Sequence, residues 1–328
     1  MMRACFSVVV LCLTIVAVLL GSASRSFADS RPNRVTQDRI LVDSHERRYL
    51  LHVPRSYVQG TSVPLVLVFH GGKQSASDMQ KLTGLNLISA DEGFIVAYPE
   101  ALDEQWNQGG GAGDSSDGSV DVTFTARLVA KLSALYSIDP QRIYAVGYST
   151  GGMMVLKLAC SLPGLFAGIS TVAASFPAGL ATTCEPPEPV SLLMINGTDD
   201  AVIPWFGANP DPRHLSVRPA NRPFLSAEET ARFWAKRASC GSTPSSRRVI
   251  DLDVKNMSYA DEYSFRSCRP GIEVAVYSLV GVGHDWPSPN LDRVAQLLAQ
   301  RTLGTQLHNF DVPRLIWKFF GRQRRIAQ

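Results

Sequence analysis

Residues 142–152 read RIYAVGYSTGG, and this stretch decides the fold. Its apolar, β-branched run leads directly into the pattern Gly-x-Ser-x-Gly, and a helix-forming segment from Met153 to Cys160 follows at once. Strand, tight turn and helix in that order form the context in which a serine becomes a nucleophile. Gly147 and Gly151 leave room where the turn brings backbone close to backbone. We therefore expect Ser149 at the apex of the turn, with its hydroxyl projecting above the edge of a sheet.

Short apolar runs alternate with helix-forming segments along most of the chain. The predicted strands cover residues 48–54, 64–69, 94–98, 142–148, 168–173, 190–195 and 273–280. The predicted helices cover residues 76–90, 121–136, 153–160, 226–236 and 311–320, and the fourth opens with a capping box. Apolar strands separated by helices predict an α/β fold with a mostly parallel central sheet and helices on both faces. No internal repeat or linker is visible, so we expect a single domain.

The first 28 residues have the pattern of a signal peptide. Arg3 supplies a positive start, an apolar run extends from Ala4 to Gly21, and Ser-Phe-Ala at 26–28 offers a cleavage site. A retained anchor is the alternative, because this run is just long enough to span a bilayer. The polar sequence that follows favours cleavage. We therefore expect a mature domain of residues 29–328 that is secreted, to the exterior or the periplasm, without stable membrane association.

The charge and the cysteines of the expected mature chain restrict its partners and its compartment. Residues 1–28 contain two arginines and no acid, so the net charge falls from +3 to +1, which gives no reason to expect nucleic acid as a partner. Four cysteines remain, and an even number in an oxidising compartment indicates two disulfides, although three pairings are open. Closure of short loops favours Cys160–Cys184 and Cys240–Cys268. No Cys-x-x-Cys or His-x-x-x-His spacing points to a metal site, so none is expected.

A serine nucleophile needs a base, and His284 is the candidate. In a strand–turn–helix hydrolase the acid and then the histidine follow the serine in chain order. Three histidines follow Ser149, namely His214, His284 and His308. His284 lies in GVGHDWP directly after the last predicted strand, where a loop can carry an imidazole back over the serine. His214 lies in a proline-rich loop and His308 lies beside the final helix, so both are interpreted as surface residues.

The acid that orients this imidazole is expected at the end of the strand predicted over 190–195. That strand runs into Asn-Gly-Thr-Asp-Asp, and the role of the acid is to hold the imidazole in the correct tautomer. We assign Asp200, because Thr198 and Asp199 are suited to capping the turn. Asp285 is the competitor, but adjacent residues rarely point so that one orients the other.

Two backbone N–H groups are needed to stabilise the oxyanion of an acyl-transfer intermediate. One is predicted at Thr150, which follows the nucleophile and starts a helix. The other is expected in the loop after an early strand, where Val-Phe-His-Gly-Gly occupies residues 68–72 and Gly72 is the predicted donor. His70 then has a structural role in bracing that loop.

The motifs of the chain, taken in order, carry a family resemblance. They are HGG (70–72), YP (98–99), WN (106–107), DVTF (121–124), DPQRIY (139–144), GYSTGGMM (147–154), NGTDDAVIPW (196–205), GHDWP (283–287), FD (310–311) and IWKFF (316–320). This set resembles the secreted α/β-hydrolase family of polyhydroxybutyrate depolymerases, feruloyl esterases and acetylxylan esterases. The resemblance implies the α/β-hydrolase fold and the triad Ser149, Asp200 and His284, and it strengthens the expectation of paired cysteines.

The sequence therefore predicts a serine carboxylesterase that needs no metal or organic cofactor. Its expected substrates are polyhydroxyalkanoate oligomers, feruloyl or acetyl esters of plant polysaccharide, or small esters. Loops 104–119 and 205–225 follow strands, at the edge where α/β sheets bind ligands, and Trp106, Trp205 and Trp286 are candidate substrate-binding residues, with a place in the core as the alternative for each. A serine peptidase on the same fold and a non-enzymatic polysaccharide-binding protein are the rival functions.

Overall fold

The computed structural model describes residues 34–109, 119–185, 188–207, 224–253, 257–289, 304–305 and 310–325. All of them fall in one compact unit, residues 33–328. The predicted signal peptide, His214 and His308 lie outside the described residues. So do parts of loops 104–119 and 205–225. Within the described segments, no helix combines the length and apolar character needed to cross a bilayer.

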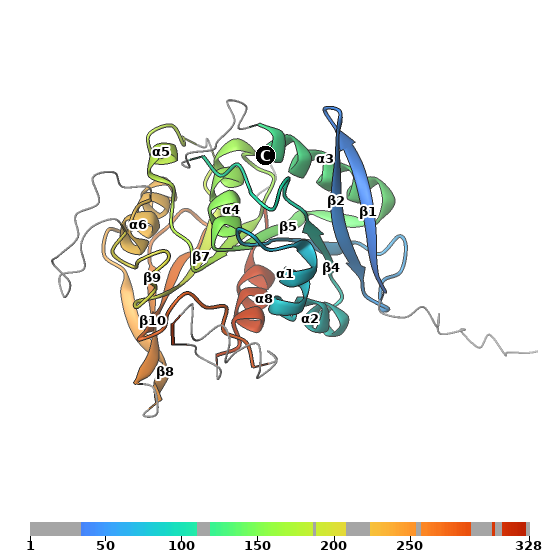
Figure 1. Ribbon diagram of the computed structural model, residues 1–328. Helices are drawn as coiled ribbons and strands as arrows, with labels where there is room; N and C mark the ends of the chain where they lie inside the picture. The colour runs from blue at the N-terminus through green and yellow to red at the C-terminus, as the bar shows by residue number, and fades with distance from the viewer. Residues whose placement is uncertain are drawn as a thin grey trace, which may run out of the picture. The chain divides into compact units, whose positions relative to one another are not determined.

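Within the described residues, the strands form one ten-stranded sheet. It runs through the centre of the domain, with helices on either side (Figure 1). Its strands are β1 (Arg34–Val42), β2 (His45–Val53), β3 (Val63–Phe69), β4 (Ile95–Pro99), β5 (Ile138–Tyr148), β6 (Gly168–Val172), β7 (Ser191–Gly197), β8 (Ser245–Asp253), β9 (Ser258–Phe265) and β10 (Val274–Val280). They are ordered β1-β2-β4-β3-β5-β6-β7-β10-β9-β8. The six strands from β4 to β10 pair in parallel, and the pairs at either side of them are antiparallel. The predicted mostly parallel central sheet is confirmed.

Helices cover both faces of this sheet. They are α1 (Ala76–Thr83), α2 (Leu85–Glu92), α3 (Val120–Leu135), α4 (Thr150–Ser161), α5 (Ala178–Ala181), α6 (Ala227–Arg237) and α8 (Val312–Arg322). Helices α3, α4 and α6 pack on the face that contains Leu67, Ala145 and Leu192. Helices α1, α2 and α8 pack on the opposite face, and Figure 1 shows these three grouped together. Side chains buried on both faces explain why the central strands are continuous apolar runs.

Local details depart from the sequence prediction where the hydrophobic pattern is weak. The helix predicted over 76–90 is two helices, because Gly84 adopts φ 63° and breaks it between α1 and α2. Strand β1 and the hairpin of β8 and β9 were not predicted; they lie at the two edges of the sheet, where strands mix polar with apolar residues. The capping box at α6 is present, with reciprocal bonds between Ser226 and Glu229.

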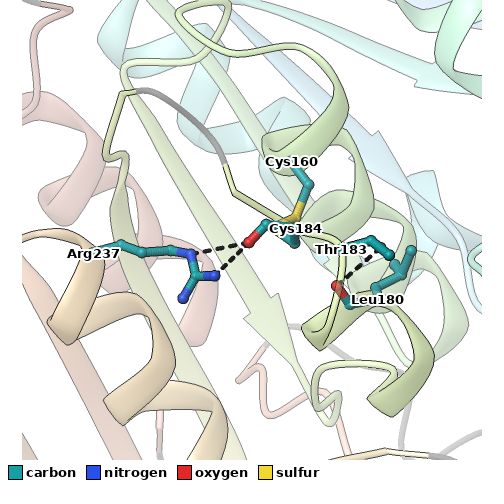
Figure 2. The surroundings of a disulfide bond; sticks show 5 residues. All are labelled: Cys160, Leu180, Thr183, Cys184 and Arg237. Atoms are coloured by element: carbon teal, nitrogen blue, oxygen red, sulfur yellow. Dashed lines mark hydrogen bonds between the residues drawn. A yellow bond between two sulfur atoms is a disulfide. The ribbon is translucent and has the colours of Figure 1, made fainter.

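Two disulfides join the cysteine pairs that loop closure favoured, Cys160–Cys184 and Cys240–Cys268. Figure 2 shows the first pair, which ties the end of α4 to the segment after α5. The guanidinium of Arg237, on α6, donates to the carbonyl oxygen of Cys184 through both Nε and Nη2. The disulfide and this contact connect the helix that follows Ser149 to α6 through the segment around Cys184.

Candidate active site

The turn between β5 and α4 holds Ser149 in a strained backbone conformation. Ser149 has φ 53° and ψ −125°, and its N–H donates to Val172 O at the end of β6 (2.9 Å). A Cβ on Gly147 would overlap the carbonyl group of Gly151, so this crossing requires glycine. A positive φ at a residue other than glycine costs free energy and is typical of functional turns. The side chain stays near the surface of the sheet edge, with 8% of the residue exposed.

His284 and Asp200 are in contact at the same edge of the sheet. His284 follows β10 and Asp200 follows β7, and these two strands pair in parallel. His284 Nδ1 and Asp200 Oδ2 lie 2.7 Å apart, and both side chains are buried. The other carboxylate oxygen, Asp200 Oδ1, accepts from the N–H groups of Val202 and Ile203, each at 2.8 Å. The carboxylate is thus held by its own turn while it orients the imidazole.

The loops after β7 and β10 are held against each other at Gly197. A Cβ there would overlap the carbonyl oxygens of Val282 and Gly283, immediately before the histidine. Thr198 Oγ1 accepts from Gly281 N at 3.0 Å, and Asp199 N donates to Val282 O at 3.0 Å. Thr198 and Asp199 therefore hold the two loops together, while the neighbouring Asp200 contacts the imidazole.

Tyr148 links the serine turn to the histidine loop. Its hydroxyl donates to the carbonyl oxygen of His284 (3.1 Å), and its ring centroid lies 5.1 Å from the imidazole centroid. Burial, together with the carboxylates of Asp285 and Asp200, raises the pKa of the Tyr148 phenol, which keeps it a hydrogen-bond donor. The structure records no hydrogen bond between Ser149 and His284, both of which are described; such bonds are often long without substrate. Sequence reasoning did not single out Tyr148.

The loop after β3 lies against Ser149 and Thr150. A Cβ on Gly71 would be 3.3 Å from Ser149 Cβ, and one on Gly72 would be 3.4 Å from Thr150 Oγ1. Gly71 N–H already donates to Gln74 Oε1 (2.9 Å). In the described part of the chain, the N–H groups of Gly72 and Thr150 make no hydrogen bond. Two donors therefore converge beside the serine, and one of them is at the N-terminus of α4.

His70 braces this loop through both ring nitrogens. Nε2 accepts from Ala101 N at 3.0 Å, so Nδ1 carries the proton and donates to Gly71 O at 2.8 Å. Burial lowers the pKa of the His70 imidazole, which keeps it neutral in this role. The carbonyl oxygen of His70 accepts from the indole of Trp106 (2.8 Å), which joins the loop after β4 to the loop after β3.

A buried network that the sequence analysis missed fixes the residue after Trp106. Asp121 on α3 accepts from Arg47 Nη2 (2.7 Å) and from Asn107 N (2.8 Å). Lys157, buried on α4, donates to Asn107 O at 2.5 Å. The one sequence feature that pointed to this network is Lys157 itself, a charged residue within the otherwise apolar run of α4. This network connects the helix that begins beside Ser149 to the loop that starts at β4.

The three candidate tryptophans lie in different surroundings. Trp106 is 3% exposed and packs edge-on against Phe69, while Trp286 is 1% exposed and packs edge-on against Tyr148. Trp205 is half-buried and lines a cavity between α6 and β9. Of the three, Trp205 alone is partly exposed. No group of three or more His, Cys, Asp or Glu side chains within the described ranges is arranged to hold a metal ion.

The chain was compared with protein families and with known proteins. Residues 48–180 match the family described as esterase PHB depolymerase. The putative esterase NocK of Nocardia uniformis subsp. tsuyamanensis is 30% identical over 259 residues, which cover 77% of this chain and 74% of NocK. This chain belongs to the PHB depolymerase esterase family. The family and the fold identify an ester hydrolase.

Further esterases and a depolymerase match at lower identity. Feruloyl esterase B of Piromyces equi is 24% identical over 242 residues, and poly(3-hydroxyalkanoate) depolymerase C of Paucimonas lemoignei is 25% identical over 262 residues. The matched regions cover 73% and 72% of this chain, but only 42% and 58% of those two relatives. An acetyl xylan esterase from Aspergillus awamori superposes with a TM-score of 0.53 at 15% identity, covering 76% of this chain and 94% of that one. The predicted α/β-hydrolase fold is confirmed.

Proposed function

We propose that this esterase is a serine carboxylesterase with the triad Ser149, His284 and Asp200. The observation that carries the proposal is the 2.7 Å bond between Asp200 and His284, at the edge where Ser149 sits in its strained turn. A carboxylate on Nδ1 keeps the proton there and leaves Nε2 as the base that faces a serine. Strain at Ser149 supports the same role, since a positive φ persists only where the surroundings enforce it.

The reaction proceeds through an acyl-enzyme. Ser149 Oγ attacks the ester carbonyl carbon while His284 Nε2 takes the hydroxyl proton, and the N–H groups of Thr150 and Gly72 stabilise the oxyanion. The tetrahedral intermediate collapses as the C–O bond to the alcohol breaks and the imidazolium returns its proton to the leaving oxygen. Water then attacks the acyl carbon with His284 as base, which releases the carboxylic acid and restores Ser149. Apart from the ester and one water molecule, these steps use groups of this chain.

The proposed substrates are polyhydroxyalkanoate oligomers and feruloyl or acetyl esters of plant polysaccharide. The names of the relatives support both, since they include feruloyl esterases, an acetylxylan esterase and depolymerases. A serine peptidase on this fold and a non-enzymatic binding protein are the alternatives. Turnover of p-nitrophenyl acetate, methyl ferulate and hydroxybutyrate oligomers, measured beside a peptide p-nitroanilide, separates them.

We also propose that residues 1–28 are removed on export and that residues 29–328 form the secreted catalytic domain. Both disulfides support an oxidising compartment, because such bonds persist outside the reducing cytosol. The N-terminal sequence of the protein recovered from culture medium or periplasm tests the cleavage, which is expected before Asp29. Recovery of chains that still begin at Met1 in the membrane fraction would contradict it.

Labelling with a fluorophosphonate tests the nucleophile. The wild-type enzyme is expected to take up one probe per chain, at Ser149, with parallel loss of esterase activity. Ser149→Ala is expected to take up none and to retain the wild-type melting temperature. Probe attached to another residue of the active enzyme, or undiminished hydrolysis by Ser149→Ala, would overturn the assignment.

A further inference from the structure

A cavity of about 290 Å³ lies between α6 and the strands β9 and β10, on the sheet face that α3, α4 and α6 cover. Its side walls are aromatic: the rings of Trp205, Tyr263 and Phe265 all line it. Val276 and Ala231 form apolar parts of its surface. A concave site of this size with aromatic walls is large enough for one or two ring-shaped groups of a ligand.

The polar groups at this cavity form a balanced set of donors and acceptors. Glu228 and Arg232, one turn apart on α6, form an ion pair in which Nε and Nη2 both contact Oε1, at 2.9 Å and 2.8 Å. Their side chains are 64% and 49% exposed, so they stand at the mouth. Arg232 Nη1 donates to Ser242 O (2.7 Å). One N–H on each Nη atom is then left to donate to a ligand.

Further hydrogen-bonding capacity comes from the aromatic residues themselves. Within the described residues, the indole N–H of Trp205 and the hydroxyl of Tyr263 make no hydrogen bond, and neither does Glu228 Oε2. An ion pair has no net charge, which disfavours both an anion and a cation as ligand. A purely aliphatic ligand would strip water from these groups without replacing their hydrogen bonds, which is costly. A neutral ligand with hydroxyl groups on its edge and apolar C–H faces fits both the rings and the polar groups.

One residue that lines the cavity, Trp205, belongs to the same segment after β7 as Asp200. Trp205 follows Asp200 by five residues, and this spacing limits the two Cα atoms to within about 18 Å of each other. Trp205 O accepts from Ala227 N (2.9 Å), which fixes the tryptophan at the N-terminus of α6, next to Glu228. A polymer with one substituent at the proposed triad, of which Asp200 is a member, therefore has a second site within reach at Trp205.

We propose that this cavity is a glycan-binding subsite that holds a sugar ring of the polysaccharide chain carrying the ester. Pyranose rings stack their C–H faces on Trp205 and Tyr263, while their hydroxyls bond to Glu228, Arg232 and the indole N–H. The inference rests on the proposed function in one respect, that the hydrolysed ester is carried on a glycan. The binding itself requires no catalysis and is measured separately.

Direct binding is the first test, with the Ser149→Ala variant and xylan freed of its acetyl groups. In affinity gel electrophoresis, xylan in the gel is expected to retard Ser149→Ala. Adding Trp205→Ala is expected to weaken the binding at least tenfold, and adding Tyr263→Phe by about twofold, since the ring remains. The matched control is Trp317→Ala, because Trp317 is a half-buried tryptophan that stacks on Phe94 at the opposite face. This control is expected to leave the retardation unchanged.

Kinetics supply the second test, in the otherwise wild-type enzyme. Trp205→Ala is expected to raise KM for acetylated xylan at least fivefold more than KM for p-nitrophenyl acetate. Trp205→Phe keeps a ring and serves if the alanine variant is unstable. Absence of xylan retardation in Ser149→Ala, or retardation that Trp205→Ala leaves intact, would overturn the glycan subsite. Retardation by hydroxybutyrate oligomers in place of xylan would overturn it in favour of a polyester ligand. If Ser149→Ala instead retains full hydrolysis, the proposed function fails and the binding result stands apart from it.

Discussion

Replacing Asp200 with asparagine is expected to disable the base while it leaves the loop intact. The carboxylate contacts three groups: Val202 N–H and Ile203 N–H on Oδ1, and the His284 ring on Oδ2. In Asp200→Asn, the amide oxygen stays at the Oδ1 position, since the alternative would place an NH₂ group against two N–H donors. Loss of two hydrogen bonds would cost about 2 kcal/mol before repulsion is counted, so the flipped amide is a minor species.

The amide NH₂ then faces His284 Nδ1, which must present its lone pair. The proton moves to Nε2, the atom that accepts the proton of Ser149 in the proposed mechanism. A forced tautomer of this kind lowers kcat by about 10⁴ in serine hydrolases, which is about 5.4 kcal/mol of transition-state stabilisation. KM is expected to change by less than about threefold, because the carboxylate of Asp200 is buried beneath the imidazole, with 4% of the residue exposed.

Steady-state hydrolysis of p-nitrophenyl acetate measures this effect, with the melting temperature recorded beside it. Asp199→Asn is the matched control, because it makes the same chemical change at the neighbouring, exposed residue. This substitution is expected to change kcat less than twofold. Asp285→Asn tests the competing acid. If Asp200→Asn keeps more than a tenth of the wild-type kcat, or if Asp285→Asn loses more activity than Asp200→Asn, the reasoning from the 2.7 Å contact is wrong.

Three further predictions follow from local geometry. Gly197→Ala is expected to push Val282 O away and lower kcat/KM at least 100-fold, whereas Gly179→Ala, with no atom within 4 Å of the new Cβ, should leave kcat/KM unchanged; equal effects in p-nitrophenyl acetate assays would contradict this. Cys160→Ala/Cys184→Ala opens a loop with a sequence separation of 24 and is expected to lower the free energy of unfolding in urea by about 3.5 kcal/mol; a loss under 1 kcal/mol would show that loop closure does not set the effect. Burial lowers the pKa of the His52 imidazole below its ordinary 6.5. As the pH falls from 6.5, the imidazole is therefore protonated in the unfolded chain before it is protonated in the folded chain. The free energy of unfolding decreases over that range. In urea titrations at pH 7.5 and 5, His52→Phe is expected to reduce that loss and the exposed His45→Gln is not; equal pH dependence in wild type and His52→Phe would refute it.

Sequence reasoning was strongest where a side chain has one physical role. Central strands such as β5 and β7 are buried on both faces, so their apolar runs are unmistakable. The pairing of Asp200 with His284 followed from chain order, because parallel strands bring their carboxyl ends to one edge. Both inferences depend on local pattern and on connection rules, which a single sequence contains.

What escaped prediction depends on contacts between distant segments. Edge strands such as β8 have one neighbour and alternate weakly, so their sequences resemble loops. Asp121, Asn107 and Lys157 meet only after α3, α4 and the loop after β4 have packed, and no spacing rule relates them. Tyr148 reads as one more apolar strand residue, although its hydroxyl contacts a carbonyl 136 positions later.

The strand order has a consequence for the sequence of events in folding. Among the described strands, β10 comes last in the sequence, yet it lies between β7 and β9. The hairpin of β8 and β9 cannot join the sheet until β10 arrives, and the same strand delivers His284. A nascent chain that ends before residue 280 therefore has an open edge at β7 and lacks His284, the proposed base. The contact between His284 and Asp200 joins distant segments, and such contacts form slowly, so we expect the ester-cleaving centre to form late in folding, after the chain has been made at least to residue 284.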